Sequence, residues 1–136
     1  YSPLYHLKYA ESDDGINWER NNISCIIPKD NYECTARPSV IKEDGLYKMW
    51  YCYRGSFDYR DGEDSYQIGY AESTDGVSWT RKDDEVGLGI SPCGFDSEMA
   101  TYPSVIDVKN NRYMFYNGNG FGVNGIGLAI YNNKTK

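Results

Sequence analysis

Residues 69–81 read GYAESTDGVSWTR and repeat residues 8–20, which read KYAESDDGINWER. A second pair of segments follows in the same order, because residues 36–41 (ARPSVI) return as residues 101–106 (TYPSVI). The offset of this second pair is 65 residues. Ordered matches at a nearly constant offset indicate a repeat architecture, in which one structural unit is used more than once.

One complete unit is predicted within residues 36–82. We expect its strands at 36–42, 46–54, 66–73 and 77–82, because β-branched and aromatic runs there alternate with Asp-Gly turn signals. The second strand contains YKMWYCY, which is apolar on both faces and typical of a sheet covered on both sides. Four short antiparallel strands fit a blade of a β-propeller. We therefore predict an all-β, propeller-type fold with little helix.

The rest of the chain supplies partial units. Residues 5–20 are expected to form the last two strands of one blade, and residues 102–131 the first three strands of another. The 136 residues are thus predicted to form one propeller-like domain with about two blade repeats. A ring of four or more blades needs about 260 residues. We expect the open blade edges to be covered by a homo-oligomer or by the remainder of a longer chain, with a compact two-blade sandwich as the third alternative.

Composition excludes several classes of function. The chain has 14 Lys and Arg against 20 Asp and Glu, a formal net charge of −6, which disfavours binding to nucleic acid or to an anionic membrane surface. The cysteines form no C-x-x-C pair and His6 is the one histidine, so no metal and no cofactor are expected. Without a signal-peptide pattern, we expect a reducing, cytoplasmic compartment. Four buried thiols are then predicted, at Cys25, Cys34, Cys52 and Cys93.

A family resemblance rests on five ordered segments that cover most of the chain: YAESDDGINWER, ARPSVIKEDGLYKMWYCYR, IGYAESTDGVSWTR, GFDSEMATYPSVI and YMFYNGNGFGVNGIGLA. In this series the sequence resembles the five-bladed propeller glycosidases of glycoside hydrolase families 32, 43, 68 and 130. It is most similar to uncharacterised glycosyl-hydrolase-like members that are often associated with bacterial polysaccharide genes. The resemblance covers about two blades of the five and implies a carbohydrate ligand. In these families the base or nucleophile aspartate comes from the first blade, which the chain does not match.

Catalytic candidates lie where the chain leads into the innermost strands at 36–42 and 102–108, because propeller sites open at one end of the central channel. Glycoside cleavage needs two carboxyl groups, and the candidates are Glu33, Asp96 and Glu98. Asp96 and Glu98 are two residues apart, so an extended chain would project both side chains to the same side. Glu33 and Glu98 are repeat equivalents, and a repeated carboxylate also suits a structural role, bonded to backbone amides or to an arginine.

The candidate substrate-binding residues are polar side chains that can hydrogen-bond sugar hydroxyls and aromatic rings that can stack on a pyranose. They are Arg37, Arg54, Tyr102, Asn117, Asn119 and Phe121. Arg37 and Tyr102 are repeat equivalents, so a shared channel would bring them together. The asparagines also suit a tight loop with no ligand.

Several functions remain open. The first is a glycoside-hydrolase-like module that recognises an oligo- or polysaccharide, with hydrolysis only if further blades are supplied. The others are a non-catalytic sugar-binding or assembly module and a protein-interaction propeller, which would need an apolar channel rim in place of these polar residues. A sialidase ranks lower, since its S-x-D-x-G-x-x-W turn is one residue longer than the turns at 12–18 and 73–79.

Overall fold

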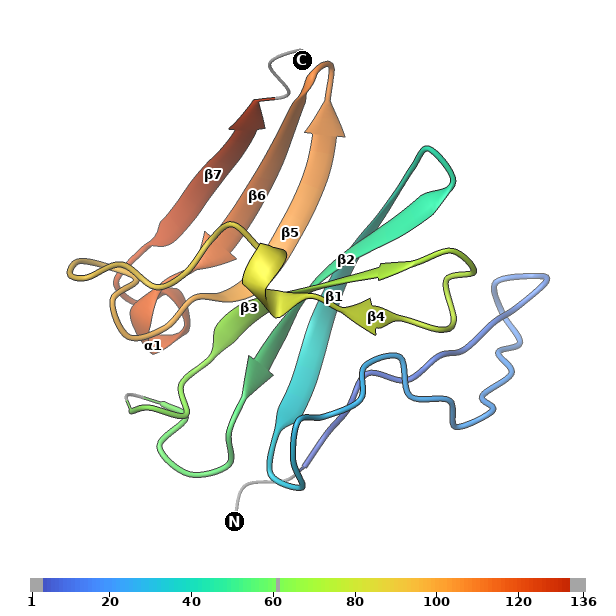
Figure 1. The fold of residues 1–136 in the computed structure, drawn as a ribbon, viewed down its shortest axis with the longest axis horizontal. Coiled ribbons are helices and arrows are strands. Elements are labelled where there is room, and N and C mark those ends of the chain that lie inside the picture. The colour runs from blue at the N-terminus through green and yellow to red at the C-terminus, as the bar shows by residue number, and fades with distance from the viewer. Residues whose placement is uncertain (1–3, 61, 133–136) are drawn as a thin grey trace.

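The structure is a computed structural model that describes residues 4–60 and 62–132. Its strands form two antiparallel sheets (Figure 1). The first sheet has the order β1 (Cys34–Glu43), β2 (Leu46–Arg54), β3 (Gln67–Ser73), β4 (Thr80–Arg81). The second has the order β5 (Thr101–Val108), β6 (Asn111–Asn117), β7 (Ile126–Asn132). The described helical turns are η1 (Asp83–Glu85), a 3-10 helix, and α1 (Asn119–Gly122), and the predicted all-β, antiparallel fold is confirmed.

The strand boundaries follow the prediction at the centre of the first sheet and depart from it at the edge. β2 covers the predicted residues 46–54, whereas β4 contains two residues in place of the six predicted at 77–82. The Asp75 carboxylate explains the loss, because it accepts hydrogen bonds from the backbone amides of Val77 (2.8 Å) and Ser78 (2.7 Å). These amides are held in a turn and are not available to a strand.

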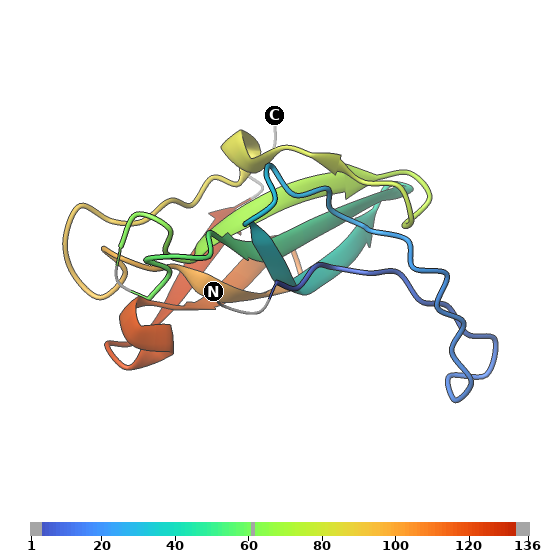
Figure 2. The ribbon, with the colours of Figure 1, turned by 90° about the horizontal axis from the view of Figure 1, so that it is seen from below.

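The N-terminal segment is an open hairpin, not the two continuous strands expected at 5–20. Isolated bridges join Lys8 to Ser24 and Glu11 to Glu19, so the second arm continues beyond residue 20. Figure 2 shows this hairpin (blue) extending away from the sheets. The tip of the hairpin repeats the Asp75 turn, because Asp14 accepts hydrogen bonds from the amides of residues 16 and 17.

A matching β-bulge shows that the sequence repeat is also a structural one. The pairing of β1 with β2 shifts register between Ala36 and Ser39, and the pairing of β5 with β6 shifts between Thr101 and Ser104. The residue after the first of each pair has positive φ, 53° at Arg37 and 55° at Tyr102. The two sheets therefore share register and bulge.

The main core lies between the two sheets. Trp50 and Tyr70 of the first sheet pack in one cluster with Val105, Met114 and Tyr116 of the second. The opposite face of the first sheet is covered by the hairpin, in a second cluster formed by Cys25, Ile26, Met49, Tyr51 and Ala71. The order in space is thus hairpin, first sheet, second sheet.

The outer face of the second sheet is apolar and exposed. Its large side chains are 42–51% exposed: Ile106, Phe115, Leu128 and Ile130. Phe115 and Leu128 are cross-strand partners and are the repeat equivalents of Trp50 and Tyr70, which are only 7% exposed. An apolar face that is buried in one repeat is therefore open to solvent in the next.

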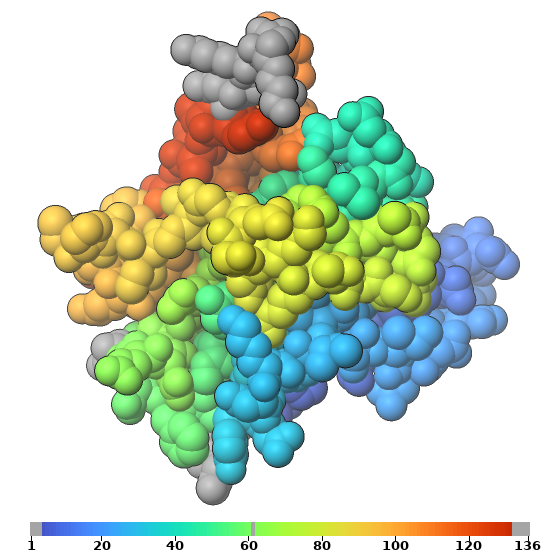
Figure 3. All heavy atoms as spheres, viewed as in Figure 1, coloured from blue at the N-terminus to red at the C-terminus, as the bar shows by residue number. Residues whose placement is uncertain are grey.

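The cysteines differ from the prediction at one position. Cys25, Cys34 and Cys52 are buried, but Cys93 is exposed. The reason is its place in the loop that follows β4, which crosses one face of the molecule in Figure 3 (yellow). Among the described residues, no helix has the length and apolar character that spanning a membrane requires.

Candidate functional site

The two bulges meet where β1 lies beside β5. The backbone amide of Val105 donates a hydrogen bond to the Ser39 hydroxyl (2.8 Å), and the amide of Tyr102 donates one to the Cys52 thiol sulfur (2.9 Å). These bonds place the Arg37 guanidinium 5.1 Å from the centroid of the Tyr102 ring. Two predicted site residues, one from each sheet, are thus in contact.

An aromatic cluster, defined here as Tyr59, Tyr66, Tyr102 and Phe121, surrounds this contact. Tyr102 stacks with Phe121 at a centroid distance of 6.1 Å and an interplanar angle of 27°. Tyr66 contacts Phe121 edge-on at 5.5 Å and Tyr59 at 6.4 Å. Tyr66 is buried, whereas Tyr59, Tyr102 and Phe121 are half-buried, so the cluster keeps part of its apolar surface in contact with solvent.

Arg54 lies behind the cluster and not on its surface. Its side chain is 2% exposed, its Nε donates hydrogen bonds to the hydroxyls of Tyr5 (2.8 Å) and Tyr66 (3.0 Å), and its guanidinium lies 4.1 Å from the Tyr59 centroid. Burial, followed by the hydrogen bond with Tyr5, raises the pKa of Tyr66, so that phenol stays protonated. Arg54 therefore supports the rings and makes no direct surface for a ligand in this structure.

Glu33 is held by Arg81. The two side chains form a bidentate ion pair, with nitrogen–oxygen distances of 2.6 and 2.8 Å, and the amide of Lys29 also donates to Glu33 (2.8 Å). Arg81 additionally contacts Asp83 at 2.6 Å. Both oxygens of Glu33 are thus engaged, as expected of a structural carboxylate.

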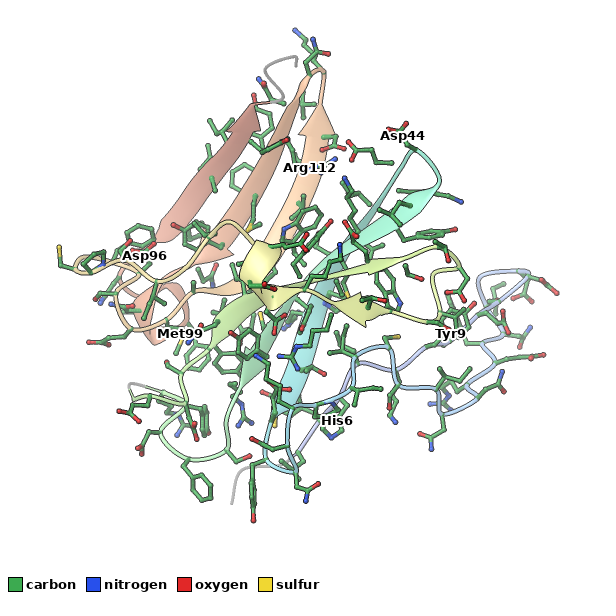
Figure 4. The ribbon with its side chains drawn as sticks, in the orientation of Figure 1. His6, Tyr9, Asp44, Asp96, Met99 and Arg112 are labelled. Carbon is green, nitrogen blue, oxygen red and sulfur yellow. The ribbon has the colours of Figure 1, made fainter. Side chains whose placement is uncertain are left out.

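Asp96 and Glu98 do not have the extended geometry assumed from their spacing, because residues 92–98 form turns and bends. Asp96 is 4% exposed and accepts a hydrogen bond from the Tyr116 hydroxyl (2.8 Å). Burial and this bond raise the pKa of Tyr116 to about 12. Glu98 is exposed, and in the described chain no ion pair or hydrogen bond involves its carboxylate. Figure 4 shows Asp96 far from Arg112, which lies toward the other end of the second sheet.

The two asparagines build the loops beside the cluster. Asn119 accepts hydrogen bonds from the amides of Glu98 (2.8 Å) and Met99 (3.0 Å), and it donates to the Gly94 carbonyl and the Ser97 hydroxyl (both 3.2 Å). Asn117 donates to the Phe121 carbonyl (2.8 Å). Because it is buried and makes four hydrogen bonds, Asn119 serves to fix the Glu98 loop.

Sequence reasoning missed Tyr66 and Arg81. Arg81 carried a usable signal, because it ends the repeated turn segment just as Arg20 does in the earlier copy. Tyr66 carried none, because its contacts come from residues far apart in the chain.

A separate hollow of about 520 Å³ lies between the sheets at the Arg112 end. Its charged side chains pair with one another, since Arg112 contacts Glu43 at 2.9 Å and Asp107 at 2.8 Å. The same guanidinium lies 5.5 Å from the Trp50 ring centroid. No residue of the predicted site lines this hollow. In the part of the chain that the structure describes, no group of three metal-ligating side chains lies close enough to hold an ion.

Comparison with known proteins places the chain among incompletely characterised relatives. No protein-family model matches it. Two uncharacterised proteins of Mycobacterium tuberculosis, MT1551 and Rv1502, are each 35% identical to it over 128 residues. The match covers 93% of this chain, which spans 40% of the length of these curated relatives.

Solved structures share the fold. One named "Glycoside hydrolase" and one of BT0996 in a complex with RGII each superpose with a TM-score of 0.67 at 23% identity, over 96% of this chain and 36% of theirs. Zg3597, a family 117 glycoside hydrolase of the marine bacterium Zobellia galactanivorans, gives a TM-score of 0.55 at 17% identity, over 96% of this chain and 38% of its own. The chain therefore has a glycoside-hydrolase-like fold.

Proposed function

We propose that the chain is part of a propeller-type ring of stacked sheets and that it recognises a carbohydrate at the aromatic cluster beside Arg37. The observation that carries the proposal is the meeting of the two repeated bulges. Arg37 and Tyr102 are equivalent residues of successive sheets and lie in contact. Equivalent positions converge in this way when repeated sheets are arranged around a common axis.

The ring is supported by the way each layer covers the next. The hairpin covers one face of the first sheet, and the second sheet covers the other. The outer face of the second sheet, with Phe115 and Leu128 exposed, is the equivalent of a face that is buried one repeat earlier. A further sheet of the same kind would complete the pattern. Because the matched relatives are longer than this chain, we assign that sheet to the remainder of a longer protein in preference to a second copy.

The carbohydrate is supported by the chemistry of the cluster. Half-buried aromatic rings offer the flat apolar surface that packs against the C–H face of a sugar ring. Arg37 beside them offers several N–H donors for hydroxyl or carboxylate oxygens. Concave or open sites that combine aromatic surface with a few polar groups are the usual form of small-ligand sites.

Hydrolysis needs more than the described residues offer. Glu98 is a free carboxylate on the loop that Asn119 fixes, and it is the remaining candidate for an acid. Asp96 is bonded to Tyr116 and Glu33 to Arg81. A second carboxylate at ~5–9.5 Å from the first is required, so we assign binding without turnover to this chain alone.

The test is a glycan array probed with the chain and with two variants. Phe121→Ala removes half of the stacked pair and should lower the signal on every bound glycan by at least tenfold. Arg20→Ala replaces an exposed arginine of the hairpin and should leave all signals unchanged. An array without any bound glycan, or binding that survives Phe121→Ala in a folded protein, contradicts the proposal.

A further inference from the structure

Arg37 carries a positive charge that the protein does not neutralise by contact. The side chain is exposed, and among residues 4–60 and 62–132 no ion pair joins it to a carboxylate, although the chain contains 20 acidic residues. Its described contact is the Tyr102 ring. The guanidinium is therefore held in place by an aromatic face, with its N–H donors directed to no acidic partner of the described chain.

The backbone at this point is strained. Arg37, Tyr102 and Phe121 have φ values of 53°, 55° and 61°, a conformation that costs a residue with a Cβ about 1–2 kcal/mol. The other described non-glycine residues with positive φ lie in loops and turns outside the strands: Asn22, Asp44 and Lys109. Arginine, tyrosine and phenylalanine have no local hydrogen bond that favours this conformation, as asparagine and aspartate do. Strain of this kind is concentrated at ligand-binding positions.

Further cations lie on the same cluster. Arg54 and Arg60 lie 4.1 and 5.0 Å from the centroid of the Tyr59 ring. Three guanidinium groups thus contact two rings of one cluster, in a protein whose net charge is −6. The positive charge is concentrated at the one place where aromatic surface is half-exposed.

We infer that the ligand of this site is a sugar acid. Its ring packs against the exposed part of the Tyr102–Phe121 pair, and its carboxylate accepts a bidentate hydrogen bond from Arg37. A planar guanidinium matches a carboxylate in geometry and charge, and charge-assisted bonds are about twice as strong as neutral ones. The inference rests on the proposed carbohydrate function and names its substrate class.

The experiment measures dissociation constants for matched pairs of oligosaccharides: trimers of glucuronic, galacturonic and mannuronic acid, and the neutral trimers of the corresponding hexoses. For at least one pair, the chain should bind the acid about tenfold or more tightly. Arg37→Gln, which keeps the length and a hydrogen-bond donor, should abolish the preference and leave the affinity for the neutral trimer within twofold. Arg20→Gln, a matched exposed arginine, should preserve the preference.

A second readout uses the unmodified protein, in case Arg37→Gln perturbs folding. Raising NaCl from 20 to 500 mM should reduce the preference for the acid several-fold and leave neutral binding unchanged. Equal affinities for acid and neutral trimers, or a preference that persists in folded Arg37→Gln, overturn the inference and leave the carbohydrate proposal standing. No binding of any trimer overturns both.

Discussion

Arg37 and Tyr102 are 65 positions apart in sequence, yet the guanidinium carbon of Arg37 lies 5.1 Å from the centroid of the Tyr102 ring. Each residue lies in the bulge of the first strand of its sheet, and their φ values agree to within 2° (53° and 55°). The strained conformation is thus a property of the repeated unit and not of one site. The unit brings its strained residues together at the place where we propose that a sugar binds.

The Glu33–Arg81 ion pair should be structural. Glu33→Gln leaves Arg81 without its bidentate partner, and the two side chains are only 6% and 16% exposed, so the free energy of unfolding should fall by about 3 kcal/mol. Glu98→Gln changes the exposed repeat equivalent and should cost less than about 0.5 kcal/mol. Urea denaturation measures both, and equal losses would show that the ion pair contributes nothing specific.

Two glycines should be required by neighbouring tyrosine rings. A Cβ at Gly69 would lie 2.6 Å from the Tyr51 Cζ atom, and one at Gly127 would lie closer still to the Tyr116 Cζ atom. Gly69→Ala and Gly127→Ala should therefore each destabilise the fold by about 1–3 kcal/mol. Gly89→Ala is the control, because no atom lies within 4 Å of its added Cβ. Thermal unfolding midpoints unchanged in all three variants would refute the close packing.

Acid should weaken the Ser-x-Asp-Gly turn. Hydrogen bonds from the amides of Ser78 and Val77 lower the pKa of Asp75 from 3.8 to about 2. A lowered folded-state pKa means that the carboxylate stabilises the fold above about pH 4, and that this contribution is lost as the pH falls toward 2. Asp75→Asn should remove that part of the pH dependence of unfolding, whereas Asp13→Asn should retain it. A carboxyl titration of Asp75 by NMR with a midpoint near 4 would contradict the assignment.

Asn119 should act through the loop and not through a ligand. Asn119→Ala removes four hydrogen bonds, two of them from the amides of Glu98 and Met99, and should cost about 2 kcal/mol of stability. The loop at 94–99 should also become more sensitive to protease. Asn124→Ala, an exposed neighbour, should change neither property. Full stability of Asn119→Ala, combined with lost glycan binding, would instead assign it direct contact.

Sequence patterns were sufficient where local spacing controls the structure. The run YKMWYCY predicted β2 to the residue, because strands buried on both faces are continuously apolar. The offset of the repeats predicted that Arg37 and Tyr102 would come together. Both features depend on a repeated register, which a single sequence displays directly.

The partners of individual polar residues could not be predicted in the same way. Arg81 reaches Glu33 across 48 residues, and Arg54 is enclosed by rings from three segments. Neither contact is encoded in local spacing. Asp96 was misplaced for a different reason, since the two-residue rule holds only in an extended chain and residues 92–98 turn.

Carbohydrate recognition at the aromatic cluster is tested most directly by titrating the ¹⁵N-labelled chain with the glycan that gives the strongest array signal. Amide shifts should change most at residues 35–37, 99–103 and 117–122, on the two sides of the Arg37–Tyr102 contact. Shift changes confined to the hollow around Glu43 and Arg112, or no saturable change at all, would contradict the account.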